Sequence, residues 1–313
     1  MRKNHFSSID ITCKIMRNIP FNKIKNRIEE EIIQDLDRIG IYYRIHSRTK
    51  TVESLQQKIT TKGEGYYQPD GKKVQDMIGY RITTYFIDDV NLLWNYFSEK
   101  FVIVDKQYDL PTSDVFKPLR KNLICRYSDD NSAIFNEAKL VDRVLDLVDN
   151  TFEIQFRTTS SEGWHEVDHA LRYKCKNDWT DYREEDKMFN GIYAILETTD
   201  RALKSLFEDM AYNHYKCKNW EAMLRMKFFL NFDKGSLSSA LKDLLNRDNA
   251  LAKKVFRCSR ADLLYKIAIS GLDIPVSFNN IVFLINYLCI KNEEISDLTP
   301  HWLVKKCDST SFN

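Results

Sequence analysis

The sequence has little glycine or proline, with 9 Gly and 6 Pro among 313 residues, which excludes long flexible or low-complexity linkers. It also lacks a long hydrophobic run. The most apolar stretch, residues 281–290, is too short to cross a membrane, and residues 1–14 have no apolar signal-peptide core. We therefore expect a cytoplasmic protein that does not associate with membranes.

Closely spaced cysteines are absent as well. The seven cysteines lie far apart and include no C-x-x-C motif, which argues against a disulfide framework or a cysteine-ligated metal. The net charge is only +2 at pH 7, but residues 14–27 and 38–73 are rich in Lys and Arg. Such a basic face suits phosphate groups, although it is also typical of an ordinary solvated surface.

What the sequence does contain is a change in hydrophobic periodicity along the chain. Helical spacing occurs in residues 22–39, 52–61, 90–99 and 137–148, whereas β-branched and aromatic runs predict strands at 78–86, 101–104, 123–127 and 152–158. After residue 160 the pattern is helical to the end. We expect an α+β fold, a mixed β-sheet flanked by helices, with an all-helical C-terminal extension. The predicted domains are residues 1–213 and 214–313.

One short motif suggests a peptidase. Residues 163–174 read GWHEVDHALRYK and contain the H-E-x-x-H pattern of a zinc peptidase helix. That reading needs a third metal ligand, for which downstream carboxylates such as Glu184, Glu185 and Glu197 are candidates. It leaves the other polar clusters of the chain unexplained.

A first such cluster spans residues 48–58, with the sequence RTKTVESLQQK. If the chain is helical after Lys50, Ser54 and Lys58 lie one turn apart on one face, where basic groups can converge on a polyanion. Taken alone, charges of this kind are also common on surface helices.

Two further clusters lie on predicted strands. Asp76 and Arg81 flank the start of one strand (DMIGYR), while Glu153, Gln155 and Arg157 alternate along another (EIQFR) and therefore share a face. Carboxylate oxygens are ligands for Mg²⁺ and guanidinium groups neutralise phosphates, so these residues suit a metal–nucleotide site. The alternative is that Asp76 and Glu153 simply pair with Arg81 and Arg157.

Four motifs occur in a fixed order: R-x-K-x-x-x-S-x-x-x-K at 48–58, D-x-x-G-x-R at 76–81, E-x-Q-x-R-T at 153–158 and W-x-x-x-x-H-x-x-R-Y-K at 164–174. Together they resemble the synthetase domain of the RelA/SpoT family, which makes the alarmones pppGpp and ppGpp, over about residues 20–210. The resemblance implies a nucleotidyltransferase-like mixed sheet and a pyrophosphokinase. Such an enzyme transfers the β,γ-pyrophosphate of ATP to a ribose 3′-hydroxyl.

The resemblance also implies roles for individual side chains. Asp76 and Glu153 would be catalytic and would bind Mg²⁺, and Glu153 would help to deprotonate the attacking hydroxyl. The residues that would hold ATP, the donor substrate, are Arg48, Lys50, Ser54, Lys58 and Arg81. The polar wall of the pocket would be completed by Gln155, Arg157, His169 and Lys174.

The sequence departs from the family between the second and third motifs. There the family carries G-Y-R-S-x-H, whose Tyr stacks on the guanine of the acceptor nucleotide. The segment that aligns best with this motif is residues 117–125. In it, Leu119 replaces the Tyr, Lys121 replaces the Ser and Leu123 replaces the His. The acceptor is therefore open between GDP or GTP, an adenine nucleotide and the 3′ end of tRNA, with Arg120 and Lys121 as candidate acceptor contacts.

The regulatory context is inferred from the same resemblance. Full-length enzymes of the family carry a hydrolase domain, rich in paired His and Asp, before the synthetase. His5 and His46 are the only histidines before Arg48 here, so we expect no hydrolase part in this sequence. We expect a regulated toxin or phage-defence effector, with residues 214–313 as the place for a regulatory or neutralising protein partner or an oligomer contact. Three alternatives stay open: a catalytically lapsed nucleotide sensor, a non-catalytic RNA-binding or interaction protein, and a zinc peptidase.

Overall fold

The computed structural model describes residues 8–63, 65–109 and 120–312, with side chains from residue 20 onward. Within them lies a five-stranded mixed sheet of order β1-β2-β5-β4-β3. Only β2 and β5, at its centre, are parallel neighbours. The strands are β1 (Tyr43–Thr49), β2 (Ile78–Thr84), β3 (Ile103–Tyr108), β4 (Lys121–Arg126) and β5 (Thr151–Thr158).

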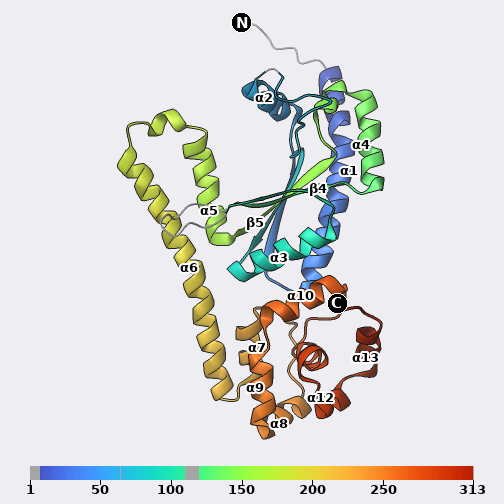
Figure 1. Cartoon of the computed structure of the whole chain (residues 1–313), viewed down its shortest axis with the longest axis vertical. Helices are drawn as coiled ribbons and strands as arrows, with labels where there is room; N and C mark the ends of the chain where they lie inside the picture. The colour runs from blue at the N-terminus through green and yellow to red at the C-terminus, as the bar shows by residue number, and fades with distance from the viewer. Residues whose placement is uncertain (1–7, 64, 110–119, 313) are drawn as a thin grey trace.

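The expected α+β architecture, a mixed sheet flanked by helices with a helical C-terminal part, is confirmed (Figure 1). The sequence analysis does not predict β1, whose sequence YRIHSRT has few strongly apolar residues. The helix expected at 137–148 instead begins at Asp129 and ends at Val141, and a short 3₁₀ turn follows.

One face of the sheet forms the hydrophobic core. Tyr80 packs edge-on against Phe152, which in turn lies against Tyr127 and Phe101. The helices that cover this face are α1 (Ser8–Ile39), α3 (Ile87–Lys100) and α4 (Asp129–Val141). In Figure 1, α1 and α4 lie on one side of the sheet and α5 and α6 on the other.

The polar side of the sheet is flanked by α2 (Val52–Lys62), α5 (Thr159–Val167) and the long α6 (Arg183–Lys216). The α5 helix starts directly at the end of β5, where Thr158 and Ser161 form a reciprocal capping box. After Val167 the helix widens into a π-helical turn, Asp168–Tyr173, and a 3₁₀ turn, Lys176–Trp179, leads to α6. This connection fixes α5 over the edge of the polar face.

Helices joined by loops make up the described C-terminal part, apart from an isolated β-bridge between Leu230 and Ile41. Its helices are α7 (Trp220–Phe228), α8 (Ser239–Arg247), α9 (Asn249–Arg257), α10 (Arg260–Ser270), α11 (Phe278–Ile285), a π turn at Asn286–Ile290, α12 (Glu293–Leu298) and α13 (His301–Asp308). Helix α6 runs through the expected boundary at residue 213 without a break. The division into two domains stays a prediction.

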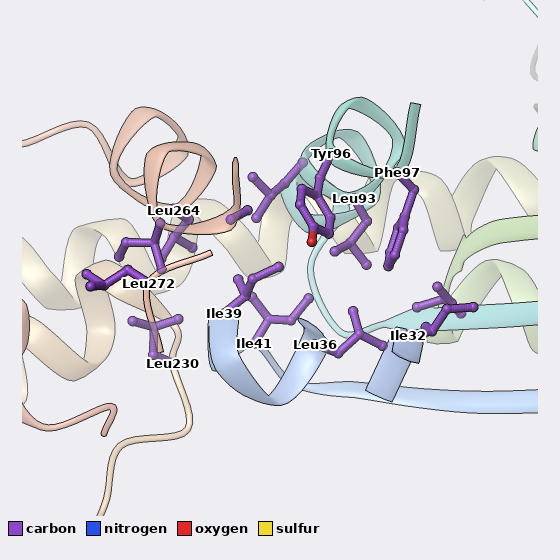
Figure 2. Packing of buried hydrophobic residues seen from close by; sticks show 14 of the residues in the cluster. Ile32, Leu36, Ile39, Ile41, Leu93, Tyr96, Phe97, Leu230, Leu264 and Leu272 are labelled. Carbon is purple, nitrogen blue, oxygen red and sulfur yellow. The ribbon is translucent and has the colours of Figure 1, made fainter. Parts of the chain in front are cut away.

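The C-terminal helices share one hydrophobic core with the sheet part. Figure 2 shows Ile39 and Ile41, at the end of α1, beside Leu264 and Leu272 of the C-terminal part. The junction is tight at Gly40. Its φ of +79° favours glycine, and a Cβ built there would meet Val276 at 2.6 Å.

Two arginines hold the junction with polar contacts. Arg38 of α1 donates hydrogen bonds to the carbonyl oxygens of Ile267 (2.9 Å) and Ala268 (3.1 Å), near the end of α10. Arg260 of α10 pairs with the buried Asp89 of α3 at 2.7 Å. The C-terminal helices are therefore attached to the same helices that cover the core face of the sheet.

Candidate functional site

The second face of the sheet is polar. Two rows of neighbours across β1, β2 and β5 lie on it, first Arg48–Gly79–Glu153 and then His46–Arg81–Gln155. Because Gly79 has no side chain, the side chain of Arg48 lies over it, with Nε 3.9 Å from where a Cβ would be. The alternation expected for Glu153, Gln155 and Arg157 therefore agrees with the structure, since Ile154 and Phe156 are buried on the other face.

Asp76 lies just before β2, where it contacts two of the predicted donor-site lysines. Its two carboxylate oxygens accept hydrogen bonds from Lys50 and Lys58, both at 2.7 Å. The backbone N–H of Lys50 also donates to the carbonyl oxygen of Met77 (2.8 Å), which joins the first two sequence motifs. The shared contact with Asp76 explains the spacing of Lys50 and Lys58 in the first motif, because α2 places Lys58 beside the carboxylate that Lys50 also contacts.

Burial raises the pKa of Asp76, but the ammonium groups of Lys50 and Lys58 outweigh that effect and hold the pKa below its usual range. Burial lowers the pKa of Lys50, which the Asp76 carboxylate only partly offsets. Ser54 is exposed on the first turn of α2, where its hydroxyl accepts a hydrogen bond from Thr51 at 3.1 Å. It lies on the same short helix as Lys58, as the sequence predicts.

Glu153 is held by two side-chain amides. Asn122 of β4 donates to Oε1 at 2.8 Å, and Gln155 of β5 donates to Oε2 at 2.9 Å. Glu153 and Asn122 are both buried, at 9% and 8% exposure. The amides fix the direction of the carboxylate without neutralising its charge, which suits a group that has to accept a proton or bind a cation.

The two arginines of the face have partners on α5. Arg81 bonds to Glu162 and Glu166, and Arg157 pairs with Glu162 at 2.9 Å. The alternative that Asp76 and Glu153 merely pair with Arg81 and Arg157 is therefore wrong. Burial lowers the pKa of Arg157, although its pairing with Glu162 acts in the opposite direction.

A pocket of about 310 Å³ lies between this face and α5. It is lined by Arg48, Arg81, Gln155, Arg157, His165, Glu166, Asp168, His169 and Tyr173. Three arginines line it together with two histidines and the carboxylates of Glu166 and Asp168, so groups of both signs meet in the pocket. Lys174 does not line it but lies close enough to His169 to lower the pKa of that imidazole, after the larger effect of burial.

The two histidines of the H-E-x-x-H motif are explained by this pocket. His165 packs against Trp164 and Tyr193, and burial together with Arg157 and Arg81 lowers its pKa to about 4. The helix also changes from α to π geometry between the two histidines. In the part of the chain that the structure describes, no group of three His, Cys, Asp or Glu side chains could hold a metal ion, so the zinc peptidase hypothesis gains no support.

The candidate acceptor residues are placed differently from the sequence alignment. Leu119 lies outside the described residues. Leu123 is fully buried in the core, and Lys121 bonds to Asn91 of α3, so both point to the core face rather than toward Glu153. Because β4 alternates, Asn122 is the residue of this segment that faces Glu153. The alignment with the family motif stays a prediction. Arg120 is largely exposed and lies 3.5 Å from Asp109.

A larger cavity, of about 1040 Å³, lies beyond the carboxyl end of β5, between α3 and α6. Lys121 and Arg157 line it, but neither Asp76 nor Glu153 does. The smaller pocket does not include these two carboxylates either. We place the candidate catalytic site on the polar sheet face because Glu153 lies on it and Asp76, just before β2, pairs with the two lysines of the first motif. Asn122, Glu162 and Glu166 are members of this face that the sequence reasoning missed.

Comparison with known proteins agrees with the sequence motifs. A family model described as "Region found in RelA / SpoT proteins" matches residues 47–178. The matched range contains the end of β1, the whole of β2 to β5, α5 and all four motifs. Residues 47–178 are therefore a RelA/SpoT-type synthetase domain, as the sequence resemblance indicates. A search of curated proteins finds no match.

Several solved structures are similar to this chain. Small alarmone synthetase 1 from Bacillus subtilis is 16% identical, with a TM-score of 0.44, over 60% of this chain and 93% of the other. A GTP pyrophosphokinase family protein from Streptococcus pneumoniae is 18% identical, with a TM-score of 0.44, over 63% and 94%. Small alarmone synthetase 2 from Bacillus subtilis is 19% identical, with a TM-score of 0.42, over 62% and 96%. No helix in the described parts of the chain is long and apolar enough to span a membrane.

Proposed function

We propose that the chain is a pyrophosphokinase that transfers the β,γ-pyrophosphate of ATP to the ribose 3′-hydroxyl of an acceptor nucleotide. The observation that carries the proposal is the composition of one sheet face. Two carboxylates, Asp76 and Glu153, lie on it among Lys50, Lys58 and Arg48. Such a face offers metal ligands and phosphate-binding cations together.

The donor would lie along the cationic part of this face. Lys50 and Lys58 are already within 2.7 Å of Asp76, so they are placed to neutralise phosphate oxygens beside that carboxylate. Arg48, Arg81 and Arg157 extend the positive charge toward α5. Their arrangement in fixed rows of a sheet holds the polyphosphate in one direction, which is the main requirement of in-line transfer.

Asp76 and Glu153 fit Mg²⁺, because their oxygens are hard ligands and their side chains share a face. Glu153 is in register with Gly79, three residues beyond Asp76. These two carboxylates would hold the metal. A bound Mg²⁺ would supply charge neutralisation to the phosphates.

Glu153 is also placed to act as the base. In the proposed reaction the 3′-oxygen of the acceptor bonds to the β-phosphorus of ATP, the bond between that phosphorus and the α,β-bridging oxygen breaks, and AMP leaves. The proton of the 3′-hydroxyl passes to Glu153, whose oxygens are oriented by Asn122 and Gln155.

The acceptor is the less defined half of the proposal. The residue predicted at the position of the family's Tyr, Leu119, lies outside the described residues, and the residue of β4 that faces Glu153 is Asn122. We propose a nucleoside di- or triphosphate as the acceptor, with Arg120, an exposed cation just before β4, as a candidate contact. A tRNA acceptor and a toxin or phage-defence role stay predictions.

The proposal is tested with ATP labelled at the γ position, Mg²⁺, and GDP, GTP, ATP or bulk tRNA as acceptor. We expect label on one acceptor with AMP, not ADP, as the second product, and no transfer by Asp76→Asn or Glu153→Gln. Glu137→Gln, an exposed carboxylate on α4, is the matched control and should retain activity. ATP binding without transfer to any acceptor would contradict the proposal and favour the lapsed sensor.

A further inference from the structure

Two cysteines that are distant in the sequence meet in the C-terminal part. Cys258 follows the last residue of α9, and Cys289 lies in the π turn after α11. Their Sγ atoms are 3.9 Å apart, with the Cys258 thiol as the hydrogen-bond donor. Their separation in the sequence gives no sign of a pair, and it is the contact of α9 with the π turn that brings the two thiols together.

Both thiols are placed where the backbone can adjust. A disulfide bond is about 2.05 Å long, so the two sulfur atoms would have to approach by about 1.9 Å. Cys258 has non-helical backbone angles (φ −56°, ψ 132°), and the π turn of Cys289 ends at Lys291, whose φ is +58°. The ends of helical segments can shift without breaking the hydrogen bonds of a helix interior. The approach therefore requires no change within α10 or α11.

The two thiols differ in their surroundings. Cys258 is 7% exposed, whereas Cys289 is exposed. Burial raises the pKa of the Cys258 thiol to about 12, and the charge of Cys289 and the hydrogen bond to it act in the same direction. Cys258 therefore stays protonated at neutral pH. An oxidant reaches an exposed sulfur first and reacts with its thiolate form, so Cys289 is the thiol that it attacks.

We propose that Cys258 and Cys289 are a redox modification site, which hydrogen peroxide converts reversibly to a disulfide that fixes α10 in place. The Cys289 thiol loses its proton, and its sulfur attacks one oxygen of the peroxide, whose O–O bond breaks. The departing hydroxide takes up that proton to form water, and a sulfenic acid is left on Cys289.

The second step consumes the Cys258 thiol. Its sulfur bonds to the sulfur of the sulfenic acid, and the S–O bond breaks. The hydroxide that leaves takes up the Cys258 proton and forms a second water. Two thiols are thereby oxidised by two electrons, and one hydrogen peroxide is reduced to two waters. A dithiol reductant reverses the change by thiol–disulfide exchange.

The disulfide would close a loop that contains α10 and α11. Helix α10 connects the C-terminal part to the sheet part at both of its ends. Arg260, two residues after Cys258, pairs with the buried Asp89 of α3 at 2.7 Å, and the carbonyl oxygen of Ile267 accepts a hydrogen bond from Arg38 of α1 at 2.9 Å. A cross-link that closes such a loop removes more freedom from the unfolded chain than from the folded one. Oxidation therefore stabilises the attachment of α10.

Peptide mapping and urea unfolding of the purified full-length chain test this proposal. The chain is treated with hydrogen peroxide, its remaining thiols are blocked with iodoacetamide, and it is cut with trypsin without reduction. We expect peptides 258–260 and 267–291 to be joined, and dithiothreitol to separate them. The equilibrium constant for unfolding should be at least about tenfold smaller for the oxidised chain than for the reduced one.

Single substitutions test the order of the two steps. In Cys258→Ala the sulfenic acid on Cys289 has no thiol to react with, so dimedone should trap it. In Cys289→Ser the buried Cys258 should remain a thiol, and peroxide should stabilise neither variant. Cys217→Ser changes an exposed cysteine that follows α6; it is the control and should gain the same stability as the unchanged chain. Circular dichroism of the reduced proteins checks folding, and Cys289→Ser, at an exposed position, remains informative if Cys258→Ala does not fold.

Three results would overturn the proposal. The first is an oxidised chain whose peptides 258–260 and 267–291 stay separate, or are joined only to other cysteines or between two chains. The second is a bond between Cys258 and Cys289 that leaves the urea unfolding curve unchanged, because the bond would then not fix α10. The third is a Cys289→Ser protein that peroxide still stabilises, since the effect would then arise at another cysteine.

Discussion

The buried ion pair between α3 and α10 allows a quantitative test of how the C-terminal helices stabilise the sheet part. Asp89 is fully buried in the first turn of α3, and Arg260 of α10 lies 2.7 Å from it. Arg260 also donates to the carbonyl oxygen of Phe228 at 2.6 Å and lies over the ring of Phe229. We predict that Arg260→Met destabilises the whole chain and not only its C-terminal part.

The magnitude follows from what the substitution leaves behind. Removing one partner of a buried ion pair costs about 3–5 kcal/mol, because the other charge stays buried without compensation. Adding Asp89→Asn removes that charge, so the double variant should regain about 2 kcal/mol relative to Arg260→Met alone. A second substitution that restores stability distinguishes a charge effect from a simple loss of packing.

The pH dependence provides a second measurement. Burial raises the pKa of Asp89, and Arg260 opposes that effect, so the pKa rises further when Arg260 is removed. A carboxyl group whose folded pKa lies above its unfolded pKa loses stability as pH rises through the folded value. Urea unfolding should therefore show a smaller deficit for Arg260→Met at pH 5 than at pH 8. A deficit that is independent of pH, or a double variant less stable than the single one, would refute the reasoning.

Two further predictions concern the polar face. Asn122→Ala should lower kcat by about 10- to 100-fold with little change in KM for ATP, because the amide orients Glu153 and does not reach the donor. Asn122→Asp should shift the acidic limb of the pH–rate profile to higher pH, since a second carboxylate raises the pKa of its neighbour. For His165, whose pKa is lowered to about 4, the folded protein loses stability as pH falls from about 6.5 toward 4; His165→Gln should remove about 2 kcal/mol of that loss.

Matched controls separate these effects from general damage. Gln107→Ala changes an amide on β3, directly opposite Asn122, and should leave kcat and the pH profile unchanged. His301→Gln changes an exposed histidine of α13 and should leave the acid-induced loss of stability as it is. An Asn122→Ala enzyme with normal kcat, or a His165→Gln protein with an unchanged pH dependence, would contradict the assigned roles.

The sequence predicted those parts of the structure that depend on local periodicity. Alternation along residues 153–157 predicted the polar face of β5, and the helical spacing after Lys50 predicted Lys58 on α2. The four ordered motifs predicted the domain type that the match over residues 47–178 confirms. Such features can be recognised from residues that are close together in the sequence, or from the order of motifs along it.

Features that depend on pairing between distant segments were not predicted. The strand order, with β5 between β2 and β4, is set by contacts across the sheet. The periodicity of a single strand does not indicate which strands are its neighbours. The role of Asn122 was not predicted either, because the pairing of β4 with β5 decides which of the alternating β4 side chains lies beside Glu153. The partners of Arg81 were not predicted either. Glu162 and Glu166 lie on α5, far along the chain from β2, and only the fold brings them next to Arg81.

Glu162 and Glu166 would affect the phosphate binding proposed above, because they already pair with the arginines. Glu162 contacts both Arg81 and Arg157, and Glu166 contacts Arg81, so the guanidinium groups are already compensated before any substrate arrives. A phosphate reaching them has to exchange places with tethered carboxylates instead of filling a bare cationic site. Such an exchange favours ligands with several linked charges, because a single charge gains little over the carboxylate it displaces. The helix that follows β5 can thus act as an internal competitor that weak anions do not displace.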